Sequence, residues 1–316
     1  MSIHTFAVAH HANVVLVYDP ASGQVRLAAR SIGPGLRLLE DTEAATWPTV
    51  EPNTLGLEVP ISLCWSPLVR CNLECPHCLD DKTLPELGAK QRAEVGRRIA
   101  ASSVPGVDIS GGEPLLMRDL PQLAGALAAA GLAVSVTTNG WHLQRRAREL
   151  AGRLHAVRVS LDGPDAARHD ALRGADSFRR ATEGIRVAVA IGVPLQIHTV
   201  VMASTLHQCA PMLKLAADLG VNGVTFLQML PIGEGAAMAD AEMLEDNLVE
   251  SHLAALTVPA GLTIRLRKRT SAGGFTVVRA DGQVWRNGRQ ALNIDAVRPL
   301  LRPGDLATAS TGDGAA

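Results

Sequence analysis

The chain is poor in the features that mark several large classes of protein. Its 316 residues include only five cysteines, too few for the dense disulfide frameworks of small secreted domains. The formal net charge is −1, so no basic surplus points to nucleic acid or to an anionic membrane surface. No apolar run is long enough to span a membrane, and the N-terminus lacks the basic region of a signal peptide. We therefore expect a cytoplasmic globular protein with neither nucleic acid nor membrane as a partner.

The chain does contain a regular alternation of strand and helix patterns. Hydrophobic residues make up 47% of the sequence, enough to bury a barrel-sized core. Strand patterns occur at 60–65, 104–110, 132–138, 155–161, 194–202 and 221–230, and helical patterns at 87–102, 118–130, 143–152, 177–191, 207–219 and 240–256. Six strand–helix units in succession favour parallel strands joined by right-handed crossovers. Because a closed barrel of this type has eight units, we expect an α/β fold with a partial (β/α)6 TIM-type barrel.

Smaller elements are expected on either side of the barrel. Residues 1–58 contain two strand patterns around a Pro-Ala-Ser-Gly turn and predict a small β-rich N-terminal element. The barrel is expected to span residues 59–258. A strand and a hairpin with an Asp-Gly turn are expected in residues 259–302. Residues 303–316 are small and polar, which predicts a disordered tail.

One face of each predicted barrel strand is polar. The members of this face are Ser62, Cys64, Ser66, Asp108, Ser110, Ser135, Thr137, Asn139, Arg158, Ser160, Asp162, Gln196 and His198. Parallel strands that are buried on both faces usually form nearly continuous apolar runs. The pattern therefore predicts a barrel interior that holds a polar ligand, with Arg158, His198 and Gln228 as candidate substrate contacts. Scattered buried Ser and Thr side chains bonded to the backbone are the alternative.

Three of the five cysteines stand together, at Cys71, Cys75 and Cys78. Their C-x3-C-x2-C spacing supplies three thiolates, the ligand type that iron–sulfur clusters select. A structural zinc site usually has a fourth Cys or His at paired spacing, and His77 lies too close to two of the cysteines to serve easily. We therefore expect a [4Fe–4S] cube with three irons held by the protein and the fourth iron open to another ligand.

Short polar motifs follow the next three predicted strands at their carboxyl ends, where parallel barrels place their active sites. They are Ser-Gly-Gly-Glu-Pro at 110–114, Thr-Thr-Asn-Gly at 137–140 and Ser-Leu-Asp-Gly-Pro at 160–164. Each motif alone is a weak signal. Together with the cysteine triplet, and in this order over about residues 58–230, they resemble the radical SAM superfamily.

The resemblance implies roles for particular residues. Cys71, Cys75 and Cys78 would ligate the [4Fe–4S] cluster, and S-adenosylmethionine (SAM) would chelate the open iron. The positions that the resemblance assigns to SAM are Gly111, Gly112, Glu113, Asn139, Ser160, Asp162, His77 and Val224. The Gly-Gly-Glu segment would bind the methionine amino group, and the two later motifs would lie near the ribose or carboxylate. The backbone at Val224 would border the adenine. His77 would lie beside the adenine, with a solvent-exposed loop histidine as the alternative.

The resemblance also implies the chemistry. One electron from the reduced cluster would cleave SAM, and the resulting 5′-deoxyadenosyl radical would abstract hydrogen from a substrate. An external one-electron reductant such as flavodoxin or ferredoxin would be the partner. The residues alone leave two other classes open, an iron–sulfur protein for electron transfer or sensing and a zinc-binding interaction module. The Gly-Gly-Glu-Pro motif favours the enzyme, because an electron carrier needs no glycine-lined ammonium site.

The segment from Ser160 to Gly174 resembles the branch of the superfamily that holds peptide-maturing and cofactor-building enzymes. Many maturases of that branch carry further cysteines for auxiliary clusters, whereas no cysteine follows Cys209 in this sequence. We therefore expect one cluster and a redox-neutral modification of a ribosomal peptide or a small specialised metabolite, such as epimerisation, dehydration, decarboxylation or rearrangement. Cys209 is a candidate hydrogen donor to a substrate radical, and a small buried apolar side chain is the alternative.

Two further features have alternative interpretations. Arg265, Arg267 and Arg269 fall on one face of a predicted strand, which suits either an anionic substrate or an edge strand protected by charge. Edge protection is the favoured interpretation. The N-terminal hairpin resembles the start of the leader-peptide recognition modules fused to some peptide maturases, and a β element that caps the barrel is the alternative.

Overall fold

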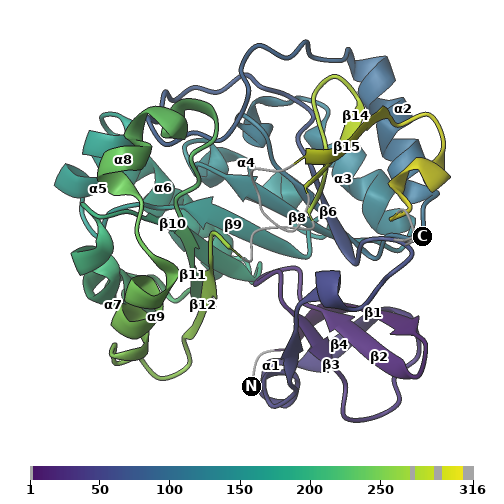
Figure 1. Cartoon of the computed structure of the whole chain (residues 1–316), viewed down its shortest axis with the longest axis horizontal. Coiled ribbons are helices and arrows are strands. Elements are labelled where there is room, and N and C mark those ends of the chain that lie inside the picture. Colours follow the sequence, from purple (N-terminus) through teal and green to yellow (C-terminus); the bar gives the residue numbers. More distant parts are fainter. Residues whose placement is uncertain (1–2, 271–274, 288–293, 309–316) are drawn as a thin grey trace, which may run out of the picture.

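We describe residues 3–270, 275–287 and 294–308 of the computed structural model. Two sheets organise this part of the chain, one of ten strands and one of five. Figure 1 shows the larger sheet surrounded by helices, with the smaller N-terminal sheet below it. No helix within the described ranges combines the length and the apolar character needed to cross a membrane.

The larger sheet carries the parallel strands that the sequence predicts. Its order is β12-β11-β10-β9-β8-β7-β6-β13-β14-β15. The strands are β6 (Ser62–Trp65), β7 (Gly106–Ile109), β8 (Ala133–Thr138), β9 (Ala156–Ser160), β10 (Leu195–Val201), β11 (Gly223–Gln228), β12 (Thr263–Arg267), β13 (Thr276–Val278), β14 (Gln283–Asn287) and β15 (Ile294–Pro299). Every pair from β6 to β12 is parallel. The six expected barrel strands are confirmed as β6 to β11, and β12 adds a seventh parallel strand.

Helices cover the outer face of the parallel strands. They are α2 (Ala89–Ala100), α3 (Leu120–Ala129), α4 (Leu143–Leu150), α5 (Ala166–Arg173), α6 (Ser177–Ala190), α7 (Cys209–Leu219), α8 (Ala239–Glu242) and α9 (Asp246–Ala254), with short 3-10 turns η1 (Pro52–Thr54), η2 (Pro114–Leu116), η3 (Leu206–Gln208), η4 (Gly233–Met238) and η5 (Pro303–Leu306). The single helix expected at 240–256 is wrong, because extended backbone at Met243 and Glu245 separates α8 from α9. Helix α5 was not predicted.

The main hydrophobic core lies between these helices and the strands. Alternate strand residues such as Val107, Ile109, Val134 and Val136 are almost fully buried and belong to one cluster with side chains from α2, α3, α6 and α7. The intervening residues of the same strands are the polar ones. Since successive side chains of a strand point to opposite faces, the polar set faces the interior of the partial barrel.

The N-terminal residues form a five-stranded antiparallel sheet in the order β4-β1-β2-β3-β5. Its elements are β1 (Ile3–His11), β2 (Val14–Tyr18), β3 (Val25–Leu27), β4 (Gly35–Glu40), α1 (Asp41–Ala45) and β5 (Thr49–Val50). Tyr18 is buried together with Ala133, the first residue of β8. A Cβ added at Gly106, the first residue of β7, would lie 2.4 Å from the Tyr18 ring. The sheet therefore closes the end of the barrel at which its strands begin.

The C-terminal residues extend the sheet on the side opposite β12. Strand β13 pairs in parallel with β6 and antiparallel with β14, so the hairpin predicted at the Asp-Gly pair is confirmed, with Gly282 at φ +80°. The tail was expected to be disordered from residue 303, which is wrong for its first part. Pro303–Leu306 form η5, and Leu306 is fully buried. Residues 309–316 of the expected tail lie outside the described residues.

Candidate active site

The cysteine loop begins where β6 ends, and it packs backbone against backbone on the Gly-Gly-Glu-Pro motif. The Gly112 N–H donates to the Leu68 carbonyl at 3.0 Å, and the Glu113 N–H donates to the Arg70 carbonyl at 2.9 Å. A Cβ at Gly112 would lie 2.1 Å from the Arg70 carbonyl oxygen, and one at Gly111 would lie 2.4 Å from that of Leu68. Glycine is required at both positions because the cysteine loop itself makes the close approach.

The Glu113 side chain joins the Ser-Gly-Gly-Glu-Pro motif to the Thr-Thr-Asn-Gly motif by hydrogen bonds. Its carboxylate is fully buried and accepts hydrogen bonds from the Leu115 N–H at 2.8 Å, the Thr138 hydroxyl at 2.7 Å and the Asn139 N–H at 2.8 Å. Burial raises the pKa of Glu113, while these three hydrogen bonds act in the opposite direction. A carboxylate has about four acceptor positions. Three are used here, which leaves room for one further donor such as an ammonium group.

Hydrogen-bond donors surround the sulfur atoms of the loop. The Leu73 N–H and the Asn139 side-chain amide face the Cys71 sulfur at 3.4 Å and 3.6 Å. The Arg173 guanidinium faces the Cys75 sulfur at 3.9 Å. Burial raises the pKa of both thiols, so an isolated thiolate is disfavoured at these positions. Donors aimed at the sulfur atoms suit thiolates that bind iron, because they spread the negative charge of the ligand.

A buried ion-pair network lies beside Cys75. Asp162 is 1% exposed and accepts from the Arg173 Nε at 2.5 Å and the Val200 N–H at 2.8 Å. His77 Nε2 lies 3.0 Å from the same carboxylate. Burial alone would raise the pKa of Asp162, but Arg173 and His77 hold it well below its usual range. His77 is 5% exposed, so the alternative of a solvent-exposed loop histidine is wrong.

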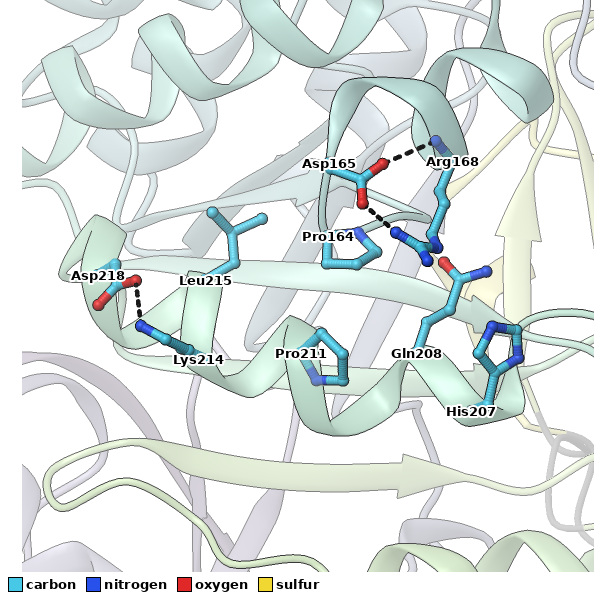
Figure 2. Close-up of a pocket in the computed structure, with 9 residues that line it drawn as sticks. All are labelled: Pro164, Asp165, Arg168, His207, Gln208, Pro211, Lys214, Leu215 and Asp218. Atoms are coloured by element: carbon cyan, nitrogen blue, oxygen red, sulfur yellow. Dashed lines mark hydrogen bonds and ion pairs between the residues drawn. The ribbon is translucent and has the colours of Figure 1, made fainter.

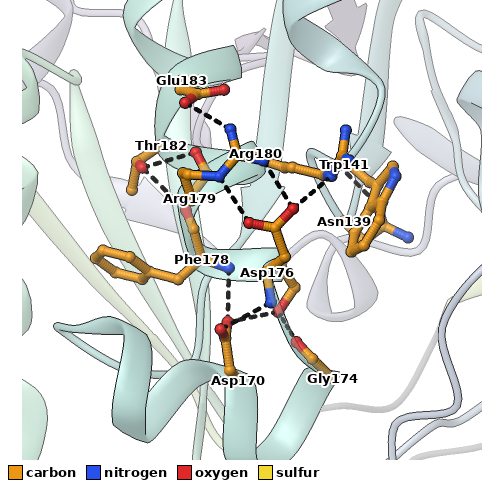
Figure 3. A network of polar contacts seen from close by, with 11 residues as sticks. Asn139, Trp141, Asp170, Gly174, Asp176, Phe178, Arg179, Arg180, Thr182 and Glu183 are labelled. Atoms are coloured by element: carbon orange, nitrogen blue, oxygen red, sulfur yellow. Dashed lines mark hydrogen bonds and ion pairs between the residues drawn. The ribbon is translucent and has the colours of Figure 1, made fainter.

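A second polar network fixes the segment that carries Arg173. Figure 3 shows that the Asp170 carboxylate on α5 accepts from the backbone N–H groups of Asp176 and Phe178. The Arg180 guanidinium on α6 packs 4.5 Å from the centre of the Trp141 ring, which follows the Thr-Asn-Gly motif. The turn between α5 and α6 is thereby joined to the third motif. This anchors the end of α5, where Arg173 reaches the cysteine loop.

The donor set of this loop fits an iron–sulfur cluster. Three thiols from one short loop lie close enough for Cys71 and Cys78 to disfavour ionisation of Cys75. Within the described ranges, no three His, Cys, Asp or Glu side chains gather around a single point as a mononuclear metal requires. A [4Fe–4S] cube instead binds each thiolate through a separate iron. Cys71, Cys75 and Cys78 would therefore hold the cluster, with Asn139 and Arg173 bonded to its sulfur ligands.

The structure contradicts one of the predicted site residues, Cys209. Val224 lies near the start of β11, with its backbone in register with Ile197 and Ile264 and its side chain fully buried in the main core. Its predicted role, a backbone that borders the adenine, stays a prediction. Cys209 begins α7 and is 1% exposed in the same core, outside the barrel interior. Burial raises the pKa of the Cys209 thiol to about 12. The alternative of a small buried side chain is correct for Cys209.

The structure also places the other residues that were candidates for the barrel interior or for a charged edge. Gln228 bonds to the Leu244 carbonyl and the Arg269 N–H, and it belongs to the strand face that packs outward, so it is not an interior contact. Arg265 and Arg267 are half-buried, with Arg265 donating to the Ser22 carbonyl at 2.6 Å. Their strand β12 is the end strand of the ten-stranded sheet, as the interpretation of a charged edge strand requires, while both side chains face the interior. Ser160 remains on the interior face, in register with His198.

Arg173 was not among the predicted site residues, although the sequence contains the start and stop signals of α5, the helix that carries it. Asp165 caps the N-terminus of α5 by accepting from the Arg168 N–H at 3.0 Å, and Gly174 ends the helix at φ +100°. A capping Asp nine residues before a Gly predicts a short helix. A helix of this length, begun directly after the Ser-Leu-Asp-Gly motif, returns its last residue to the site.

A cavity of about 320 Å³ lies outside the barrel, between α5 and α7 (Figure 2). Its charged residues pair with one another, Arg168 with Asp165 and Lys214 with Asp218 at 3.2 Å. None of the residues of the cysteine loop lines this cavity. It is therefore a surface depression that is separate from the candidate active site.

Comparison with known families identifies the fold. Residues 65–216 match the family described as the radical SAM superfamily. This segment contains the cysteine triplet and all three polar motifs that follow it.

Curated relatives are about one third identical to the chain over the aligned segments. The mycofactocin maturase MftC of Mycobacterium ulcerans is 34% identical over 190 residues, which is 57% of this chain and 50% of the relative. The AdoMet-dependent heme synthase of Methanosarcina barkeri is 32% identical over 183 residues, 56% of this chain and 52% of the relative. The chain spans about half the length of these curated relatives.

Solved structures share the fold at lower identity. Streptococcus suis SuiB bound to S-adenosylmethionine is 15% identical, with a TM-score of 0.59 over 72% of this chain and 60% of that one. Native anSMEcpe with bound AdoMet and the Cp18Cys peptide is 19% identical, with a TM-score of 0.56 over 74% of this chain and 75% of that one. These likenesses confirm the partial barrel. Residues 65–216 of this chain are therefore a radical SAM superfamily domain.

Proposed function

We propose that the chain is a radical SAM enzyme that reductively cleaves SAM at one [4Fe–4S] cluster and abstracts hydrogen from a peptide or small metabolite. The observation that carries the proposal is the contact of all three polar motifs with the cysteine loop. Gly112 bonds to its backbone, Asn139 bonds to the Cys71 sulfur, and Asp162 holds the arginine that faces Cys75. An electron carrier needs no such convergence of polar groups around one side of a cluster.

The residues of the site have separate tasks in this proposal. When bound, the cluster and SAM together supply a 5′-deoxyadenosyl radical. The free acceptor position of Glu113 and the carbonyl groups around Gly111 would receive the methionine amino group. Ser160, Asn139 and Asp162 would lie beside the ribose or carboxylate, and His77 would lie beside the adenine. Arg173 would orient Asp162 and stabilise the Cys75 thiolate, because it bonds to both.

The remaining cysteines support one cluster and a redox-neutral reaction in this proposal. Cys209 lies in the core, and Cys64 faces the interior next to Ser66, so these two thiols do not form a ligand set for a second cluster. Burial, with the nearby Asp108 carboxylate, raises the pKa of the Cys64 thiol to about 12. Cys64, and not Cys209, is therefore the proposed hydrogen donor to a substrate radical within an epimerisation, dehydration, decarboxylation or rearrangement. The thiyl radical left on Cys64 would be restored by one electron from the external reductant and one proton.

The proposed substrate is a ribosomal peptide or a small specialised metabolite. The name of MftC describes a maturase, and SuiB is known in complex with the precursor peptide SuiA. The heme synthase name supports the small-molecule alternative. A flavodoxin or ferredoxin would deliver the electron in the cytoplasm, and neither nucleic acid nor membrane is a proposed partner.

The test is anaerobic reconstitution followed by reduction with dithionite in the presence of SAM. We expect about four irons per chain and formation of 5′-deoxyadenosine and methionine. Cys75→Ala should lose both the cluster and SAM cleavage, whereas the exposed control Arg97→Gln should retain them. An intact cluster that never cleaves SAM would reject the enzyme and favour the electron-transfer alternative.

A further inference from the structure

Three arginine side chains face the interior of the partial barrel. Arg158 lies on β9, and Arg265 and Arg267 lie on β12. The Arg158 guanidinium crosses to Asp108 on β7 at 3.2 Å, over the intervening strand β8. Arg267 interacts electrostatically with Cys64 and Asp108, which lie on β6 and β7. Strands from both sides of the barrel therefore place these side chains in one shared interior.

Two of the three arginines already have partners. Arg158 pairs with Asp108 and donates to the carbonyls of Ala21 at 3.1 Å and Pro20 at 2.7 Å. Arg265 donates to the Ser22 carbonyl. These carbonyls belong to the loop between β2 and β3, which enters the barrel from the N-terminal sheet. The two arginines therefore fasten that loop to the floor of the barrel.

Arg267 has no such partner among the described residues. Its guanidinium lies 4.0 Å from the centre of the Phe275 ring, and neither a carboxylate nor a carbonyl accepts from it within the described ranges. Burial, together with the charges of Arg265 and Arg158, lowers the pKa of Arg267 to about 9. A half-buried cation that is partly withdrawn from water without a counter-ion carries an energetic cost. A bound anion would remove this cost.

The carboxylates near these arginines already have other partners. Asp108 pairs with Arg158 and also accepts from the hydroxyls of Ser135 at 2.7 Å and Thr137 at 2.8 Å. Asp19 and Glu51 act electrostatically on Arg265, and Asp19 also bonds to His4 at 3.2 Å. Among the described residues, no carboxylate forms an ion pair with Arg267.

His198 supplies an independent observation in the same place. It lies on β10, with Thr225 of β11 between it and Arg265 in the register of the sheet. Its Nε2 atom is buried and has no hydrogen-bond partner among the described residues. Burial, with the nearby arginines Arg158 and Arg267, lowers the pKa of His198 well below its usual value. An unpartnered buried imidazole nitrogen beside uncompensated arginines points to a missing ligand.

We propose that Arg267, Arg265 and His198 bind an anionic group of the substrate, either a carboxylate or a phosphate. The planar guanidinium suits two-point binding of either group, and an anion would give Arg267 the counter-ion that the described residues do not supply. In the register of the sheet, Arg267 is level with Leu227 and Val200, and the Val200 N–H binds Asp162. The bound anion would thus lie directly below the candidate SAM site, where it would hold the reacting carbon against the cofactor.

This inference rests on the proposed function, and its test distinguishes a failure of the anion site from a failure of the proposed function. The reconstituted holoenzyme with SAM is titrated calorimetrically with inorganic phosphate and, separately, with acetate, against chloride at matched ionic strength. We expect one of the two probes to bind at one site per chain, and the tighter one identifies the class of substrate anion. Arg267→Gln should weaken that binding at least tenfold, about 1.4 kcal/mol. The matched control Arg97→Gln should bind like the wild type.

Thermal unfolding distinguishes an Arg267 side chain that binds an anion from one that only stabilises the fold. Without added anion, Arg267→Gln should unfold at the same or a higher temperature than the wild type, because an uncompensated buried cation is removed. It should also lose the rise in unfolding temperature that the anion produces in the wild type. A drop in unfolding temperature with anion affinity unchanged would overturn the proposal.

Should Arg267→Gln fail to fold, Arg267→Lys and His198→Gln provide the same comparison. Each should weaken the binding of the probe without loss of the cluster. Wild-type protein that cleaves SAM but binds neither probe refutes the anion site and leaves the proposed function intact. Wild-type protein that binds phosphate or acetate through Arg267 but does not cleave SAM rejects the proposed function and supports the site.

Discussion

The two ends of the barrel are built in different ways. At the end where the strands finish, the cysteine loop rests on residues that short motifs bring together, through backbone contacts such as Gly112 to Leu68. At the end where the strands begin, the closure depends on long-range side-chain contacts, such as Arg158 to Ala21 and Pro20. The first end can be recognised from local motifs. The second depends on residues about 140 positions apart, which no local pattern connects.

The charges of the two ends also differ. At the cluster end the buried cation Arg173 is matched by the Asp162 carboxylate. In the interior below it, Arg267 has no carboxylate partner among the described residues. A matched pair stabilises the structure of the site, whereas an unmatched cation marks a place where a ligand completes the structure.

The largest effect is expected at the floor of the barrel, from Arg158→Met. This change leaves Asp108 buried without its counter-ion and leaves two loop carbonyls without donors. We expect a loss of about 3–5 kcal/mol in the free energy of unfolding, measured by urea denaturation. The exposed control Arg97→Gln should change stability by less than about 0.5 kcal/mol. A loss below about 1 kcal/mol for Arg158→Met would show that the loop does not depend on this arginine.

The second largest effect is expected in the N-terminal sheet, where the free energy of unfolding should depend on pH through His4. Burial opposes the charged form of His4, but Asp19 and Asp41 raise its pKa from 6.5 to about 9. Because the folded pKa lies above the unfolded one, this stabilisation is complete below pH 6.5 and is lost as pH rises through 9. It amounts to about 3 kcal/mol. Wild type and His4→Gln should differ most in unfolding free energy below pH 6.5 and converge above pH 9. A constant difference would contradict the assignment.

A smaller loss of stability is expected at the cluster end, from Gly112→Ala. The added Cβ would meet the Arg70 and Val69 carbonyl oxygens at 2.1 and 2.5 Å, so the cysteine loop must shift. We expect a cost of about 1–3 kcal/mol and a fall in iron bound per chain after reconstitution. Gly304→Ala is the control, since nothing lies within 4 Å of its added Cβ. Full iron content in Gly112→Ala would show that the loop tolerates this displacement.

The smallest effect distinguishes the two thiols outside the triplet. Cys209→Ala should cost about 1 kcal/mol of stability and leave the product of the reaction unchanged, because Cys209 packs in the outer core. Cys64→Ala should alter the product if the interior thiol returns a hydrogen atom. Analysis of the product by mass spectrometry after turnover in deuterated water measures both. A changed product with Cys209→Ala alone would reverse the proposed assignment.

The sequence by itself determined the cofactor end of the molecule. The alternation of strands and helices was sufficient to locate β6 to β11, and the spacing of Cys71, Cys75 and Cys78 was sufficient to predict the cluster ligands. These features are local, since each depends on residues that lie close together in the chain. Local backbone geometry and ligand chemistry leave few alternatives for such patterns.

Only the tertiary structure decided which polar residues act together. Cys209 could not be excluded from the site by sequence, because burial in the core depends on packing between distant elements. The role of Arg173 required the path of α5, and the unmatched charge of Arg267 required β12 to pair with β11 and turn that side chain inward. The reason is physical: the charge balance of a buried group depends on every strand that faces it, and the sequence does not list those neighbours.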